Sequence, residues 1–208
     1  MLLSLVDSLR CPADHEESPL VLSADAWRGA HISSGTLGCP VCHARYPIQD
    51  GRVDFTGGDA KPETWRPDEP EGVDPVRLAA QLDLAEPGGI ILLSGRYAAR
   101  VEDLAALVDA VYVLVDYGET VGDSAVSVRL GARIPFAGGS FRGAAVDEHS
   151  AALLAEVTRT VRTRGRVVAP ARTTLVDGLL LRARDELEWV AEVESTVPVI
   201  PLRRSTNR

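Results

Sequence analysis

The stretch from Gly38 to Ile48 reads GCPVCHARYPI and contains two of the three cysteines of the chain. Cys39 and Cys42 are three positions apart with a proline between them, a tight knuckle that points two sulfurs at one spot. Tetrahedral zinc sites are commonly built from such C-x-x-C knuckles. The third cysteine, Cys11, lies in a second Cys-Pro segment, CPADH. The spacing therefore predicts a zinc site that joins these two segments.

A closed zinc site needs a fourth ligand, which we expect from the segment around Cys11. His15 is the softer donor and the better zinc ligand, whereas Asp14 has the more usual spacing from Cys11. Both alternatives stay open at this point, with His15 preferred. Histidines 31 and 43 are further candidates, and His43 is expected to be a solvated surface residue. The competing interpretations are three buried structural thiols and, less well supported, a redox C-x-x-C pair.

The composition of the chain restricts the class of protein to which it can belong. The chain has 208 residues, 45% of them hydrophobic and 25% charged, which is typical of a globular protein. No apolar run reaches the length of about 20 residues that a membrane span needs. Because the N-terminus lacks the features of a signal peptide and the cysteines are odd in number, we expect a reducing, cytoplasmic location.

The negative charge lies in the first part of the chain. Residues 1–75 contain 6 Lys or Arg against 13 Asp or Glu, a net charge of −7, whereas residues 76–208 contain 16 against 17, a net charge of −1. An acidic module repels phosphate backbones. We therefore expect no direct binding of nucleic acid and no association with membranes.

The pattern of apolar residues divides the chain into two domains and a linker. Residues 1–55 contain a short helix at 2–9 and strands at 20–22, 30–32, 46–48 and 52–55, a small α+β domain built on the zinc knuckles. Residues 56–75 are rich in proline, glycine and acids and predict a linker. The exposed sheet edge of the small domain is expected to pair with the second domain or with another chain.

Residues 76–208 predict a second domain in which strands alternate with helices. Its fold is expected to be Rossmann-like α/β with a mostly parallel sheet and a C-terminal antiparallel strand pair. The expected strands are 90–93, 111–115, 126–130, 143–146, 166–169, 186–193 and 197–202. The expected helices are 76–84, 98–108, 151–161 and 173–184.

Both parts resemble known families. LRCP at residues 9–12, GCPVC at 38–42 and YPIQDG at 46–51 are similar to the small zinc-binding methyltransferase-activator family. The resemblance implies a partner such as a methyltransferase or a translation-related protein, or self-association. The second domain resembles class I S-adenosylmethionine-dependent methyltransferases, on its strand order, on IPF at 134–136 with SF at 140–141, and on VRTRGRVV at 161–168.

The cofactor positions implied by this second resemblance are only partly filled. Gly95 is the single glycine of the expected cofactor loop, and bulky Arg96 and Tyr97 follow it. Asp116 stands where an acid would bind the cofactor ribose. An adenine-reading acid is missing from residues 131–133, and no catalytic motif follows the strand at 143–146. Asp147 and His149 offer acid–base chemistry there, although Asp147 or Ser150 equally suits a helix cap.

Three functions follow as hypotheses. The first, which we favour, is a non-catalytic zinc-binding scaffold or partner-binding protein with a pseudo-methyltransferase domain and no catalytic residues. The second is a divergent S-adenosylmethionine-dependent methyltransferase whose activator is fused in cis and whose cofactor contacts Gly95 and Asp116. The third is a binder of a small anion at the carboxyl ends of the strands through a cluster of Arg96, Arg133 and Arg142.

Overall fold

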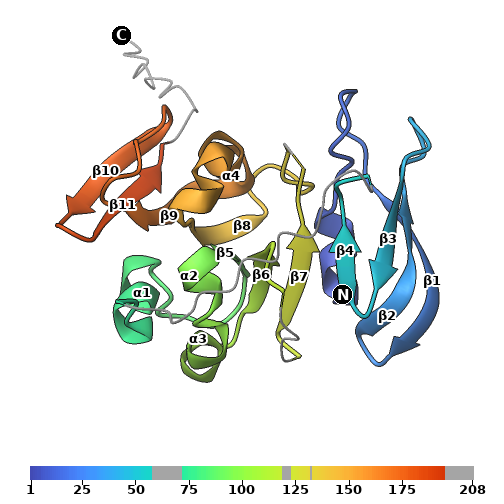
Figure 1. Cartoon of the computed structure of the whole chain (residues 1–208), viewed down its shortest axis with the longest axis horizontal. Helices are drawn as coiled ribbons and strands as arrows, with labels where there is room; N and C mark the ends of the chain where they lie inside the picture. Colours follow the sequence, from blue (N-terminus) through green and yellow to red (C-terminus); the bar gives the residue numbers. More distant parts are fainter. Residues whose placement is uncertain (58–71, 119–122, 132, 195–208) are drawn as a thin grey trace, which may run out of the picture.

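A single sheet of 11 strands runs through the described part of the chain (Figure 1). The structure is a computed structural model that describes residues 1–57, 72–118, 123–131 and 133–194. The strand order is β1-β2-β3-β4-β7-β6-β5-β8-β9-β11-β10. The first four strands come from the cysteine-bearing segment and the others from the remainder of the chain, so both predicted domains contribute to the same sheet.

The N-terminal segment begins with a short 3-10 helix and continues as two antiparallel hairpins. These elements are η1 (Leu3–Ser8), β1 (Val21–Arg28), β2 (His31–Gly38), β3 (Arg45–Gln49) and β4 (Arg52–Asp54). Asp50 and Gly51 form the turn between β3 and β4 with φ angles of +49° and +75°. Positive φ at both turn residues matches the right-handed twist of the strands. The predicted helix and all four predicted strands of this segment are confirmed, although β1 and β2 extend further than the sequence indicated.

The second segment alternates strands and helices as predicted. Its strands are β5 (Ile90–Ser94), β6 (Val111–Val115), β7 (Ala125–Arg129), β8 (Phe141–Ala145), β9 (Val161–Pro170), β10 (Leu179–Arg184) and β11 (Glu188–Val193). Its helices are α1 (Pro75–Gln81), α2 (Gly95–Ala98), α3 (Val101–Leu107), the 3-10 helix η2 (Glu148–Leu153) and α4 (Leu154–Thr160). None of the helices in these residues and in the described N-terminal segment is long and apolar enough to cross a membrane.

Strands β7, β6, β5, β8 and β9 are parallel, and β11 pairs with β9 in the antiparallel direction. In sequence order the parallel strands read 3-2-1-4-5, the Rossmann arrangement. The order reverses at β5, which lies between β6 and β8. In sheets of this kind ligands bind at the carboxyl ends of the strands beside such a switch point. The predicted fold class is confirmed, and it directs attention to the ends of β5 and β8.

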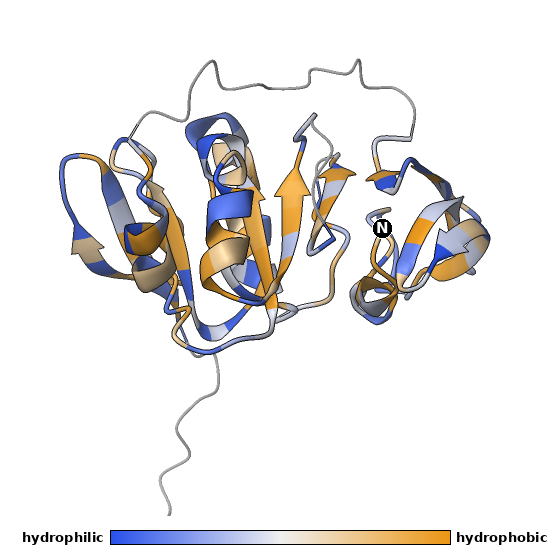
Figure 2. Cartoon of the chain, turned by 90° about the horizontal axis from the view of Figure 1, so that it is seen from below, coloured by the Kyte–Doolittle hydropathy of each residue, from blue (hydrophilic) through white to orange (hydrophobic). Residues whose placement is uncertain are grey.

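The two faces of the sheet carry separate hydrophobic clusters because successive strand residues point to opposite faces. Leu92 and Val113 pack with α4 and with the core of the N-terminal segment. Their neighbours Leu93 and Leu114 pack with α1, α2 and α3 on the other face. Figure 2 shows the hydrophobic residues concentrated along the central strands.

The N-terminal segment is joined to the second segment by backbone pairing. Strand β4 pairs in parallel with β7, where Val53 faces Val128 and Asp54 faces Arg129. The Asp54 carboxylate accepts a hydrogen bond from Arg129 at 2.9 Å. Leu9 forms an isolated bridge with Phe136, and the two belong to one core cluster. The exposed edge that the sequence predicted for the small domain is thus covered by the chain's own β7.

The C-terminal part of the second segment differs from the prediction. The helix predicted over residues 173–184 is wrong, because Leu179–Arg184 is strand β10 and pairs antiparallel with β11. The C-terminal antiparallel pair is therefore β10–β11. The strand predicted at 197–202 lies outside the described residues, as do residues 58–71 of the predicted linker. The boundaries 1–55, 56–75 and 76–208 stay a prediction.

Candidate metal centre and cofactor crevice

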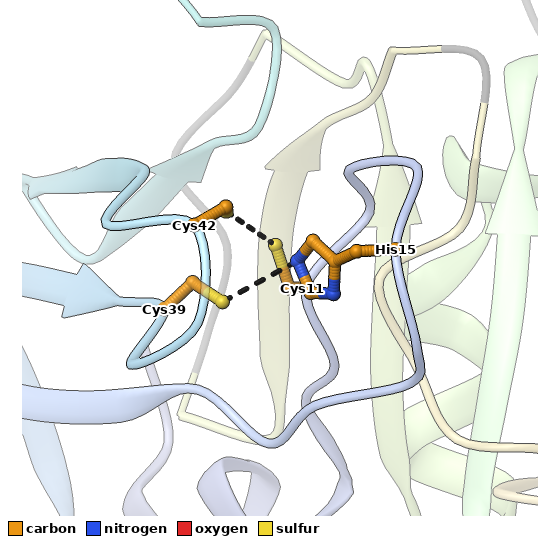
Figure 3. A group of neighbouring side chains, drawn as sticks. All are labelled: Cys11, His15, Cys39 and Cys42. Carbon is orange, nitrogen blue, oxygen red and sulfur yellow. Dashed lines mark hydrogen bonds between the residues drawn. The ribbon is translucent and has the colours of Figure 1, made fainter.

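Cys11, His15, Cys39 and Cys42 converge at the end of the small domain that faces α4 and the segment before β8 (Figure 3). Their ligand atoms, one per residue, all lie within 4.8 Å of one another. The backbone N–H of Cys39 donates to Ala44 O at 2.9 Å, and the N–H of His43 donates to Cys39 O at 3.1 Å. These bonds close the turn that contains Cys39 and Cys42. His43, within this turn, has a left-handed φ of +61°. Local backbone geometry thus presents two sulfurs to the segment that holds Cys11.

Two distances within this group match the edges of a tetrahedral zinc site. The sulfurs of Cys11 and Cys42 are 3.7 Å apart, and Cys39 Sγ lies 3.5 Å from His15 Nε2. Around zinc, with Zn–S bonds of about 2.3 Å and Zn–N bonds of about 2.0–2.1 Å, tetrahedral edges are about 3.8 Å between two sulfurs and about 3.5 Å between sulfur and nitrogen. The four residues could therefore hold a zinc ion.

His15 and Asp14, the two alternatives for the fourth ligand, occupy different places. The Nδ1 of His15 lies 2.6 Å from Glu16 O. A proton on Nδ1 donates to that carbonyl and leaves the Nε2 lone pair directed at the cysteines, the arrangement typical of metal-bound histidine. The Asp14 side chain is fully exposed and pairs with Arg133 at 3.4 Å. The geometry thus includes His15 in the group and leaves Asp14 outside it.

The electrostatics of the group favour a thiolate at Cys39. Burial opposes ionisation of this thiol, but backbone N–H groups of Cys42 and Val41 outweigh burial and lower its pKa to about 6. Burial raises the pKa of Cys11. The hydroxyl of buried Tyr46 lies 3.4 Å from Cys11 Sγ, and burial together with this contact raises the pKa of Tyr46. Tyr46 therefore stays protonated and can donate to the Cys11 sulfur.

Gly95 follows β5 at the switch point, with a φ of +53°. A Cβ at this position would lie 2.3 Å from Asp147 Oδ2 and 2.5 Å from Asp147 Cβ, so the glycine permits close approach of the Asp147 side chain. Asp147 Oδ2 accepts the N–H of Arg96 at 3.1 Å, and Oδ1 accepts the N–H of Glu148 at 2.8 Å. The Asp147 N–H donates to buried Ser94 Oγ at 2.9 Å. The ends of β5 and β8 are therefore tied together through Asp147.

A buried polar network extends from this point to β11. The Arg96 guanidinium donates to Tyr97 Oη at 3.1 Å and lies 3.6 Å from Glu188. The Tyr97 hydroxyl donates to Glu188 Oε1 at 2.9 Å, and Gln81 of α1 donates to Oε2 at 3.1 Å. Tyr97 is fully buried, and Glu188 is 7% exposed. Both bulky residues after Gly95 are thus anchored within the fold.

Asp116 follows β6 directly, as Gly95 follows β5. Since Ser94 and Val115 are register partners, the structure places Gly95 and Asp116 at the same edge of the sheet. Asp116 Oδ1 accepts the N–H of Leu130 at 3.2 Å. Burial raises the pKa of Asp116, against the opposing effects of the Leu130 N–H and Arg129. One oxygen of the Asp116 carboxylate is therefore already bonded to the backbone of Leu130, the residue that follows β7.

The arginine cluster that the third hypothesis requires does not form. Arg142 lies near the start of β8 and donates to the carbonyls of Asp83 and Gly88, which precede β5. Parallel strands β5 and β8 place that region at the opposite edge from Arg96. Arg133 pairs with Asp14 beside the metal group. The separation of Arg142 from Arg96 could have been predicted, because Arg142 precedes the strand predicted at 143–146 whereas Arg96 follows the strand predicted at 90–93.

Asp147 caps the helix that follows β8, which was one of its two predicted roles. His149 is exposed and belongs with Asp147 and Glu148 to a group whose ligand atoms lie within 4.8 Å. Sequence reasoning did not identify the contacts of Tyr46, Asp147 and Glu188. Tyr46 lies close in sequence to the Cys39–Cys42 knuckle, so a contact with the cysteines could have been predicted. The contact of Asp147 with Gly95 spans 52 residues of the chain and that of Glu188 with Tyr97 spans 91, so neither has a local signal.

Several solved structures are similar to part of this chain. A Methanococcus maripaludis protein described as an S-adenosylmethionine-dependent methyltransferase is 10% identical over 61% of this chain and 85% of its own, with a TM-score of 0.45. A Bacillus halodurans protein described as a methyltransferase is 17% identical, with a TM-score of 0.37 over 47% of this chain and 50% of its own. A Haloferax volcanii complex of the Trm112 methyltransferase activator with a methyltransferase is 14% identical over 46% of this chain and 50% of its own, with a TM-score of 0.37.

The chain spans about half the length of the Bacillus halodurans structure. No curated protein sequence matches it. A family model described as Trm112p-like protein matches residues 3–51, the segment that contains Cys11, His15, Cys39 and Cys42. The N-terminal segment is thus similar to Trm112p-like protein, and it precedes a domain with a Rossmann-like sheet.

Proposed function

We propose that this chain is a non-catalytic scaffold or partner-binding protein, in which a zinc-stabilised activator-like module is fused to a pseudo-methyltransferase domain. The observation that carries this proposal is the packing of Asp147 against Gly95. In a nucleotide-binding sheet of this kind, glycine at the end of the first strand lets the backbone approach the ligand. Here the space that the glycine leaves open is filled by the Asp147 side chain of the protein itself.

The residues around the switch point do not fit S-adenosylmethionine in the usual position. Both Asp147 oxygens already accept backbone N–H groups, and the carboxylate contacts the one glycine of the loop. Arg96 and Tyr97 are held by Glu188. A cofactor that approached Gly95 would have to displace a buried carboxylate from two hydrogen bonds and leave its donors unpaired, at a cost of about 1–3 kcal/mol for each unpaired group.

A divergent methyltransferase is the second candidate, and one observation favours it. Gly95 and Asp116 follow a register pair at the same edge of the sheet, which is the relation that a cofactor contacting both residues requires. In this alternative Asp116 would hold the ribose hydroxyls, and Asp147 would have to move away from Gly95.

Isothermal titration calorimetry of the full chain with S-adenosylmethionine distinguishes the two candidates. The scaffold proposal expects no binding at ligand concentrations of about 1 mM. Micromolar binding that is lost in Asp116→Ala and kept in Asp109→Ala would overturn it in favour of the methyltransferase. Asp109 is a suitable control because it lies before β6, at the opposite edge of the sheet from Asp116.

We also infer that Cys11, His15, Cys39 and Cys42 bind one structural zinc ion in a reducing, cytoplasmic environment. Four protein ligands leave no open coordination position, so the ion would stabilise the fold rather than activate water. The nearness of Tyr46 to Cys11 Sγ supports this assignment, since neighbours that donate to ligand atoms orient metal sites.

Metal analysis of protein purified without chelator tests the zinc site. We expect about one equivalent of zinc for the native chain and for Asp14→Asn, whose side chain points away from the group. Cys39→Ser and His15→Ala should lower the zinc affinity by at least about tenfold. Unchanged zinc content in Cys39→Ser would refute the site, and loss of zinc in Asp14→Asn alone would transfer the fourth ligand to Asp14.

A further inference from the structure

A cavity of about 420 Å³ lies beyond the carboxyl ends of β8 and β9. Its volume is within the range of small-molecule sites, about 300–1,000 Å³. The lining residues come from η2, from the first residue of α4 and from the segment after β9. They are Glu148, Ala151, Leu154, Arg172, Thr173, Thr174 and Val176.

Thr173, one of the lining residues, has an unused hydrogen-bonding group. The residue is 8% exposed, and its buried hydroxyl oxygen has no hydrogen-bond partner among the described residues. Its backbone is fixed, because the Thr173 N–H donates to Pro170 O at 2.9 Å and the buried Trp189 ring donates to Thr173 O at 2.8 Å. A buried hydroxyl without a partner destabilises the folded protein. A ligand that bonds to this hydroxyl would remove that penalty.

Opposite charges stand next to each other at the rim. Glu148 and Arg172 form an ion pair whose side chains are 34% and 73% exposed. An exposed pair of this kind contributes little to stability, so a ligand can separate the two groups at small cost. Because the two side chains are in contact, a ligand that bridges them must carry its own two charges on neighbouring atoms. The ammonium and carboxylate on the α-carbon of a free amino acid meet this condition, whereas the distant termini of a peptide do not.

The remaining wall is apolar. Leu154 is 1% exposed, and Ala151 and half-buried Val176 lie beside it. Aliphatic side chains line this wall without an acid or base among them, which suits a branched aliphatic group.

We propose that this cavity binds a free α-amino acid with an aliphatic side chain. The ligand carboxylate pairs with Arg172, its ammonium group pairs with Glu148 and donates to the Thr173 hydroxyl, and its side chain packs on Leu154 and Val176. This site is separate from the cofactor crevice, and its occupation requires neither the scaffold nor the methyltransferase function. It replaces the anion site that the sequence suggested around Arg96.

Calorimetry with L-leucine on the full chain tests the proposal, with saturation-transfer NMR as a second readout. We expect saturable binding at concentrations below about 10 mM. N-acetyl-L-leucine and L-leucinamide, which each lack one of the two charges, should bind at least about tenfold more weakly. Failure of L-leucine to bind, or equal binding of all three compounds, would overturn the proposal.

Three variants connect the binding to the named residues. Arg172→Gln and Glu148→Gln should each weaken L-leucine binding about tenfold. The control Arg182→Gln, which removes an exposed pair with Glu192 on β10 and β11, should leave binding unchanged. Equal effects of Arg172→Gln and Arg182→Gln would show that the rim pair has no part in binding.

Thr173→Val separates binding from folding. Removal of the unpartnered hydroxyl should raise the Tm of the ligand-free protein by about 2–4 °C. The same change should weaken L-leucine binding by about three- to tenfold. A raised Tm with unchanged affinity would overturn the role of Thr173, and a lowered Tm would show that its hydroxyl is satisfied in the folded protein.

Discussion

Gly95 shows how one residue decides what the switch point of the sheet contains. A left-handed φ of +53° and the contact with Asp147 both require that this position lack a side chain. The glycine alone is compatible with a cofactor loop, and on that basis the methyltransferase hypothesis gave Gly95 as a cofactor contact. Its partner is 52 residues away along the chain, so only the tertiary structure could show that Asp147 occupies the space.

Gly95→Ala should destabilise the protein by about 2–4 kcal/mol, because it combines an unfavourable φ with a collision against a buried side chain. Gly29→Ala is a matched control, since Gly29 has a φ of +58° and nothing within 4 Å of its added Cβ. We expect about 1 kcal/mol for the control. Urea denaturation measures both, and equal losses would mean that the Asp147 contact contributes nothing beyond the backbone strain.

Asp116→Asn should raise the free energy of unfolding at neutral pH. Burial raises the pKa of Asp116 in the folded state, so its favourable contribution exists below the pKa of the unfolded chain and is lost as pH rises through the folded pKa. Asparagine accepts the same Leu130 N–H and tolerates the left-handed φ of +52°.

The gain from Asp116→Asn should shrink on acidification and vanish below about pH 3.9, the ordinary pKa of aspartate. Denaturation curves of both proteins at several pH values give the difference directly. A gain that is independent of pH would show that ionisation of Asp116 is not its cause.

At the scale of elements, the local sequence pattern predicted the secondary structure correctly where tertiary packing favours the same structure. The short apolar runs at 90–93 and 111–115 became β5 and β6, and the Asp50-Gly51 turn formed its hairpin. The predicted helix at 173–184 failed because Leu179 is buried against the sheet, whereas Leu180 and Leu181 remain 42% and 43% exposed. An edge strand that is largely exposed has no clear alternation of apolar residues, so β10 is specified by its pairing with β11.

The N-cap of helix α1 is a local feature whose contribution to stability can be tested. Asp74 caps it by accepting the N–H groups of Val76 and Arg77, at 2.9 and 3.4 Å, and Pro75 occupies the first position. Asp74→Ala should lower the free energy of unfolding by about 1 kcal/mol. Asp74→Ser keeps a capping oxygen and should retain most of the stability. If both variants lose the same amount in urea denaturation, the cap is not the source of the effect.

Over the whole molecule, the two parts predicted from the sequence contribute strands to one sheet and side chains to one core, while their boundaries stay a prediction. The knuckle spacing of Cys39 and Cys42 and the strand–helix alternation were sufficient to predict the convergence of the three cysteines and the Rossmann-like sheet. Pairing of β4 with β7 could not be derived, because the sequence shows an exposed edge without showing which strand covers it. The result is a core cluster that includes Leu37 and Ile48 of the small module together with Val128 and Phe136.

A shared core predicts one cooperative thermal transition for the full chain. Leu9→Ala removes a side chain that is 2% exposed at the bridge to Phe136, and it should cost about 2–5 kcal/mol without splitting that transition. Removal of zinc by a chelator should likewise lower the Tm of the whole transition. Differential scanning calorimetry measures both effects, and a separate low-temperature transition in either experiment would mean that the module unfolds independently.

The pairing of β4 with β7 also has a consequence for synthesis of the chain. Residues 52–54 leave the ribosome before residues 125–129, so β4 waits with an open hydrogen-bonding edge while about 70 more residues are translated. Once β7 emerges, the covalent connection gives its partner strand a high effective concentration and a fixed one-to-one ratio. The edge of β7 that β4 covers is then closed to pairing with a strand of any separate protein.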